Sequence, residues 1–170
     1  MHRLFGVAVS QRWPLVIIAI ALLVGGFVTS IVLADEGGNR AQDATAAAAA
    51  AELGRPLPEV RSTFAGLHRS GIGLDPVGAP SRKVHVSYAI GEKNLVLLRV
   101  FRGALAAADT QDSIALANGV AASVSTKTLS DGTTDVGYAW SKDGLSYTLH
   151  VNLSQGLTRI AADEIARSVK

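Results

Sequence analysis

The side chains of this sequence that are suited to metal or acid–base chemistry are few. The chain has four histidines and no cysteine. His85 and His150 fall on the polar positions of segments whose apolar residues alternate, so neighbouring strands would bring both onto one face. Two imidazoles without a nearby carboxylate fall short of the three or four ligands that a zinc site needs. We therefore predict no metal site and no cofactor, and interpret both histidines as surface residues of strands.

Motifs for nucleophilic catalysis and phosphate binding are absent from the sequence. Many serine hydrolases carry the nucleophile in Gly-x-Ser-x-Gly, and a phosphate-binding loop reads Gly-x-x-x-x-Gly-Lys-[Ser/Thr]. Neither pattern occurs here. The lack of cysteine also excludes a thiolate nucleophile and a lipid-anchor cysteine. We predict that the protein is not an enzyme, and we assign no catalytic residue.

Three aromatic residues are the candidates for ligand binding. Tyr138, Trp140 and Tyr147 fall on the apolar positions of two consecutive alternating segments. On the concave face of a sheet they would line a pocket for an acyl chain or another apolar ligand. The alternative is that they pack in the core beneath a helix, as aromatic residues on neighbouring strands commonly do.

The elements that must position these residues are strands. Apolar and polar residues alternate from Val84 to Ile90, which is typical of a half-buried strand. The segment from Asn94 to Arg102 is apolar on both sides, so we expect it to be central in the sheet. Asn118-Gly119 is a strong hairpin signal, because a type I′ turn needs positive φ at both central residues. With further turns at Ser130-Asp131-Gly132 and Asp143-Gly144, the pattern predicts a meander of about five or six antiparallel strands with one apolar face.

The chain ends in a helical pattern. Ser154 is a suitable N-cap, and apolar residues then recur at steps of three and four, namely Leu157, Ile160, Ala161, Ile165 and Val169. A sheet with one apolar face must be covered, and this helix is the expected cover. The predicted fold class is α+β, with an N-terminal transmembrane helix and then a curved antiparallel β-meander sheet covered by a C-terminal helix.

Residues 14–34 carry no charged side chain and are long enough to span a bilayer as a helix. Arg3 and Arg12 precede this span, whereas Asp35 and Glu36 follow it. The positive-inside rule then predicts a short cytoplasmic N-terminus, 1–13, and an extracytoplasmic remainder. A cleaved secretory signal is the alternative, although the apolar run is longer than such signals usually have.

The exported part divides into a spacer and a domain. Residues 35–54 are rich in glycine and then alanine, and we expect an Ala-rich stalk with a helix between Arg40 and Leu53. The extracytoplasmic α+β domain is then 55–170. Within it, apolar residues spaced by four and three between Glu59 and Arg69 predict a short helix.

The placement of charge bears on partners. The chain has 16 basic and 14 acidic residues, and two of the basic ones lie in residues 1–34, which leaves 14 against 14 outside. Nucleic-acid binding needs basic residues clustered on one face, and the sequence has no such cluster. We predict the membrane as a partner, together with an envelope protein or an apolar ligand, and no nucleic acid.

A series of short motifs lies in the C-terminal half. In order they are Asn118-Gly119, Trp140, Gly144, Tyr147, the pair Leu153-Ser154, and the helix end Ile165-Ala166-Arg167-Ser168-Val169. Across residues 83–169 this order resembles a bacterial extracytoplasmic domain of unknown function, which is found at the C-termini of membrane-anchored anti-sigma factors. That domain is similar to the half-barrels of the periplasmic lipoprotein carrier and of the anti-sigma regulator RseB.

The resemblance implies a fold and a location, and it suggests an envelope sensor or binding domain. The thirteen residues before the span are too few for a sigma-binding domain, so we expect no direct anti-sigma role. The predicted function is a single-pass, membrane-anchored extracytoplasmic domain that binds another envelope protein or a peptide without catalysis. The alternative is a lipid or lipoprotein chaperone that uses the concave face of the sheet.

Overall fold

The computed structural model describes residues 42–79, 81–105 and 112–170. The predicted N-terminus, 1–13, and the predicted transmembrane segment, 14–34, lie outside these residues, so both stay predictions. Among the residues described, no helix combines the length and the apolar character needed to cross a membrane.

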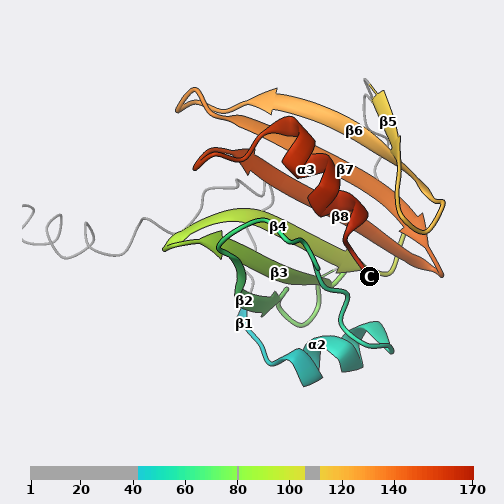
Figure 1. Cartoon of the computed structure of the whole chain (residues 1–170). Coiled ribbons are helices and arrows are strands. Elements are labelled where there is room, and N and C mark those ends of the chain that lie inside the picture. Colours follow the sequence, from blue (N-terminus) through green and yellow to red (C-terminus); the bar gives the residue numbers. More distant parts are fainter. Residues whose placement is uncertain (1–41, 80, 106–111) are drawn as a thin grey trace, which may run out of the picture. The chain divides into compact units, whose positions relative to one another are not determined.

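The strands of the described chain form one antiparallel sheet of eight (Figure 1). In spatial order they are β1 (Gln42–Asp43), β2 (Leu67–Leu74), β3 (Lys83–Ile90), β4 (Lys93–Phe101), β8 (Leu145–Leu153), β7 (Thr134–Lys142), β6 (Ala121–Thr128) and β5 (Asp112–Ala115). A helix near the C-terminus packs on this sheet, so the antiparallel α+β class with a C-terminal helix is confirmed.

The strand order corrects the predicted single meander. Strands β1 to β4 follow one another across one half of the sheet, and β5 to β8 across the other. However, β5 lies at the far edge, and β8 returns to pair with β4. The central position predicted for the segment that forms β4 is confirmed. Turn signals specify which neighbouring strands form hairpins, but they say nothing about which hairpin edge meets a distant strand.

The hairpin at Asn118-Gly119 is present, but its turn is not the predicted type I′. Only Gly119 has a positive φ, of 77°, and its N–H donates to the carbonyl of Leu116. The β7–β8 hairpin turn Asp143-Gly144 does have positive φ at both central residues, at 52° and 77°, and it joins Lys142 directly to Leu145. A two-residue turn of this kind fixes the register of β7 against β8.

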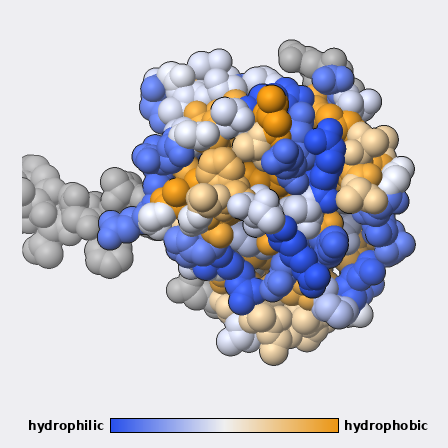
Figure 2. All heavy atoms as spheres, viewed as in Figure 1, coloured by the Kyte–Doolittle hydropathy of each residue, from blue (hydrophilic) through white to orange (hydrophobic). Residues whose placement is uncertain are grey.

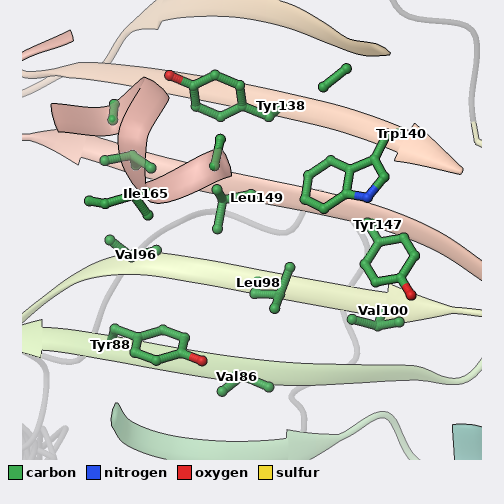
Figure 3. Packing of buried hydrophobic residues seen from close by; sticks show 14 of the residues in the cluster. Val86, Tyr88, Val96, Leu98, Val100, Tyr138, Trp140, Tyr147, Leu149 and Ile165 are labelled. Atoms are coloured by element: carbon green, nitrogen blue, oxygen red, sulfur yellow. The ribbon is translucent and has the colours of Figure 1, made fainter. Parts of the chain in front are cut away.

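One side of the sheet carries the apolar core, and we name it the helix face. By register, one row of this face crosses five strands. Its members are no more than 2% exposed, and they are Val86, Leu98, Leu149, Tyr138 and Val124. Figure 3 shows several of them together with Ile165 of the C-terminal helix. Because strand residues alternate between faces, the other side holds the intervening residues. We name it the polar face.

The C-terminal helix α3 (Arg159–Arg167) begins later than predicted. Its N-cap is Thr158, whose Oγ1 accepts a hydrogen bond from the backbone N–H of Ala161 at 3.3 Å. Ser154 instead opens a turn that returns to Leu157. Ile160 was predicted to lie in the apolar stripe, but this residue is 73% exposed. The buried side of α3 is formed by Ala161, Ala162, Ile165 and Ala166.

The Ala-rich segment contains a helix that belongs to the folded domain. Helix α2 (Ala46–Leu53) is capped by Thr45 at its start and by Gly54, with φ of 68°, at its end. Ala49 and Leu53 are 0% and 3% exposed and join the core. The predicted helix is therefore present, but its description as a stalk outside a domain of residues 55–170 is corrected, because it packs on the sheet.

The prediction of a short helix between Glu59 and Arg69 is wrong. Residues 67 onward belong to β2, and Val60 lies in an isolated antiparallel bridge with Val169. The backbone of Glu59 exchanges two hydrogen bonds with Lys170, and the Val60 N–H donates to the Tyr88 hydroxyl at 2.8 Å. These long-range partners satisfy the extended backbone, so local helical spacing does not decide its conformation.

Candidate functional site

The three aromatic residues predicted to bind a ligand lie on the helix face. Tyr138, Trp140 and Tyr147 are 1%, 3% and 6% exposed. The rings of Trp140 and Tyr147 are stacked, with centroids 5.1 Å apart and planes at 5° (Figure 3). Over this side of the molecule, hydrophilic and hydrophobic residues are interspersed at the surface (Figure 2). The trio therefore packs as part of the core, which is the second of the two readings that the sequence allowed.

The hydroxyl of Tyr138 attaches α3 to the sheet. It donates to Asp163 Oδ1 at 2.7 Å, and the same oxygen accepts from Arg159 Nε at 3.0 Å. Burial and the Asp163 carboxylate raise the pKa of Tyr138 well above the usual range of a phenol. Burial also raises the pKa of Tyr147. Both phenols are thus neutral at ordinary pH, and neither is suited to act as a base.

Both predicted histidines lie on the polar face, and each is paired with an aspartate. His85 Nε2 lies 2.7 Å from Asp75 Oδ1, and both residues are buried. The other oxygen of Asp75 accepts the backbone N–H of Lys83. This pair therefore fastens the start of β3 to the loop that follows β2.

His150 forms the second pair. Its Nδ1 lies 2.9 Å from Asp135 Oδ2, and since a carboxylate only accepts, we assign the proton to Nδ1. Register places β4 between the two histidines, with His85 opposite Arg99 and His150 opposite Leu97. Two strand spacings of about 4.8 Å across the sheet and an offset of two residues along β4, about 6.7 Å, separate their backbones by roughly 12 Å. The histidines share a face, but they do not share a site.

Gly137 provides room for the His150 ring. It is the register partner of His150 on one side and of Ser125 on the other. A Cβ at Gly137 would lie 2.8 Å from Ser125 Oγ and 3.6 Å from His150 Cε1. Ser125 and His150 therefore lean over Gly137 from opposite strands. Within the described part of the chain, no hydrogen bond joins the His150 ring to a hydroxyl, so we assign no activated nucleophile.

This pair and a second hydrogen-bonded group lie side by side, because Asp135 is opposite Asn152, and together we name them the polar cluster: Asp131, Thr133, Asp135, His150 and Asn152. Thr133 Oγ1 donates to Asp131 Oδ1 at 2.6 Å and accepts from Asn152 Nδ2 at 3.0 Å. Hydrogen bonds from the Thr133 side chain and backbone lower the pKa of Asp131. Asp135 is 7% exposed. Asp135 Oδ1 and Asn152 Oδ1 are both buried and find no hydrogen-bond partner in the described chain.

The polar cluster is the candidate functional site, because it concentrates buried polar atoms whose hydrogen bonding is incomplete. Within the described ranges, no three side chains of histidine, aspartate or glutamate come together as metal ligands do. The cluster instead combines one buried carboxylate with neutral oxygen atoms. Such a set presents hydrogen-bond acceptors, and it is complementary to a cation or to a hydrogen-bond donor.

Sequence reasoning found His150 but missed its partner Asp135 and the neighbouring Asn152. The signal that would have found them is the two-residue turn Asp143-Gly144. Once that turn is placed, residues equally distant from it are opposite each other, which pairs Gly137 with His150 and Asp135 with Asn152. No sequence signal predicts the hydrogen bond between Thr133 and Asn152, because this bond depends on the conformation of the β6–β7 turn.

No family model, curated protein or solved structure matches this chain. The resemblance to the anti-sigma-associated domain therefore stays a prediction.

Proposed function

We propose that this protein is a single-pass, membrane-anchored binding domain of a bacterial envelope, and that it contacts another envelope protein or a peptide without catalysis. The apolar span 14–34 and the arginines before it support the anchor and its orientation. The folded domain then lies outside the membrane, as a sensor or an accessory subunit.

The observation that carries this proposal is the difference in exposure between the two faces. The helix face is filled by the domain's own side chains, so it offers little area to a partner. The polar face retains accessible hydrogen-bonding side chains in adjacent strands: Ser125 is exposed, and Thr148 and His150 are partly exposed. Small polar side chains on a sheet form a flat surface that suits another protein.

The alternative of an apolar ligand has no comparable support. Tyr138, Trp140 and Tyr147 would each have to lose their present packing before an acyl chain could contact them. We therefore do not carry the chaperone forward as a second function.

Crosslinking on intact spheroplasts with a membrane-impermeant reagent tests location and partner together. We expect one reproducible crosslinked protein with the full chain, and its loss with Ser125→Arg, which places a bulky cation on the polar face. Glu164→Arg, an exposed change on α3, is the matched control and should retain the crosslink.

The outcomes separate two failures. If the reagent modifies the domain only after lysis, the proposed topology is wrong. If modification occurs but the crosslinked species are the same random set for the full chain and for Ser125→Arg, binding through the polar face is wrong.

A further inference from the structure

We propose that the polar cluster binds a hard cation such as Ca²⁺, with Asp135 Oδ1 and Asn152 Oδ1 as its protein ligands. This site is independent of the proposed function, because it requires neither the anchor nor a protein partner. It lies where the β6–β7 turn and the end of β8 come to the same end of the sheet (Figure 1).

Register brings the two oxygen atoms together. Asp135 and Asn152 are opposite residues on β7 and β8. Side chains that are opposite on one face have Cβ atoms about 4.5–5.5 Å apart. Two oxygens carried on such positions can both contact one ion at the roughly 2.3–2.6 Å typical of calcium ligands. Carboxylate and amide carbonyl oxygens are the donors that hard cations prefer.

The second observation is that both oxygens are buried and lack a partner in the described chain. The side chain of Asp135 is 10% exposed, so its charge is largely removed from water. A buried carboxylate oxygen without a donor is unfavourable, and a cation between the two oxygens would satisfy both.

The other members of the polar cluster hold these ligands in place. His150 binds the second oxygen of Asp135, which fixes the orientation of the carboxylate. Thr133 binds the amide nitrogen of Asn152, which turns Asn152 Oδ1 away from Thr133. Outer partners of this kind commonly orient the ligands of a metal. Asp131 bonds to Thr133 and adds a second negative charge nearby.

Two features oppose strong binding. Lys127 is the register partner of Asp135 on β6 and brings a positive charge to the same face. A single buried carboxylate also supplies little charge for a divalent ion. We therefore expect a weak site, with a dissociation constant of roughly 10⁻⁴ to 10⁻³ M, and water as the remaining ligands.

The competing arrangement is a rotated Asn152 amide. With its nitrogen toward Asp135 and its oxygen toward Thr133, Asn152 would donate to the carboxylate, and no ion would be needed. Binding to the original chain separates the two arrangements, because a rotated amide leaves no site for an ion. In a cation site, Asn152→Asp adds a second carboxylate and raises an affinity that the original chain already shows.

The experiment is equilibrium dialysis of the full chain, in detergent micelles, against ⁴⁵Ca²⁺. We expect one saturable site, an affinity about tenfold higher in Asn152→Asp, and loss of that site in Asp135→Asn. Asp143→Asn makes the same chemical change at the exposed far turn of the same hairpin, and it should leave binding unchanged. Competition by Mg²⁺ and Na⁺ then ranks the hard cations, with Zn²⁺ as the contrasting ion.

Two results would overturn the proposal. One is the absence of saturable binding in the original chain, whatever Asn152→Asp shows, provided that circular dichroism shows the chain to be folded. The other is equal binding in the original chain and in Asp135→Asn, which would locate the ion elsewhere.

Discussion

The two faces of the sheet are built by the same strands, yet they satisfy their side chains in different ways. On the helix face, apolar side chains from five strands lie in register and are almost completely buried, and α3 packs against β7 and β8. On the polar face, His150, Asp135 and Asn152 are held by specific hydrogen bonds, and two buried oxygens remain unsatisfied by the described chain. The comparison teaches that stability and binding capacity are separated by the simple alternation of residues along β6, β7 and β8.

Leu149→Ala gives the largest expected effect, because it creates a cavity at the centre of the helix face. Leu149 is 0% exposed, and its register partners are Leu98 and Tyr138. Loss of a buried leucine typically lowers the free energy of unfolding by about 2–5 kcal/mol. Chemical denaturation measures it. Thr148→Ala, one residue away on the polar face, is the control and should cost less than about 1 kcal/mol. Equal losses would show that the faces do not differ.

Gly137→Ala tests packing on the polar face. The new methyl group would lie 2.8 Å from Ser125 Oγ, so the serine must move. We expect a loss of about 1–2 kcal/mol in the free energy of unfolding, as for other overpacked positions. The double variant Gly137→Ala/Ser125→Ala should recover part of the loss, since the clashing oxygen is gone. A double-mutant cycle without coupling between the two sites would contradict the described packing.

Tyr138→Phe removes the polar contact between α3 and the helix face while it keeps the ring in the core. We expect a loss of about 1–2 kcal/mol at neutral pH, because the hydrogen bond to Asp163 is lost. The folded-state pKa of Tyr138 is raised by burial and by Asp163, so the stability that it contributes is present below pH 10 and falls as the pH rises further.

Denaturation between pH 9 and 11 measures this dependence. Tyr138→Phe should show a shallower loss of stability over that range than the original chain. Identical slopes for the two proteins would mean that Tyr138 ionises as freely when folded as when unfolded.

The sequence predicted strands β3 to β8, but not β1 and β2, because burial on one face produces a period of two that can be read directly. Tyr138, Trp140 and Tyr147 were placed on one face by that rule, and the core reading of them followed from the need to cover the sheet. The start of α3 was predicted too early, because Ser154 and Thr158 are both suitable N-caps. In the structure a turn at Gln155-Gly156 follows Ser154, and the helix begins after Thr158.

What the sequence did not predict depends on contacts between distant segments. Val60 pairs with Val169 and Glu59 with Lys170, and no local sequence pattern predicts such partners. The burial of α2 was missed for a related reason. A run of alanine has no pronounced apolar stripe, but small side chains fit closely against a sheet, as Ala49 does. Only part of the polar cluster could have been predicted, namely the residues whose pairing follows from the register set by Asp143-Gly144.

The pairing of β4 with β8 also has a consequence for how the chain folds. Every other strand pair in the sheet joins neighbours in the sequence, whereas Val96 meets Val151 across the long excursion through β5, β6 and β7. Bringing β4 and β8 together closes a long loop, and the chain loses that entropy before the contacts between the two strands form. We therefore expect each half to assemble early from local contacts, and the union of the two halves at β4 and β8 to set the folding rate.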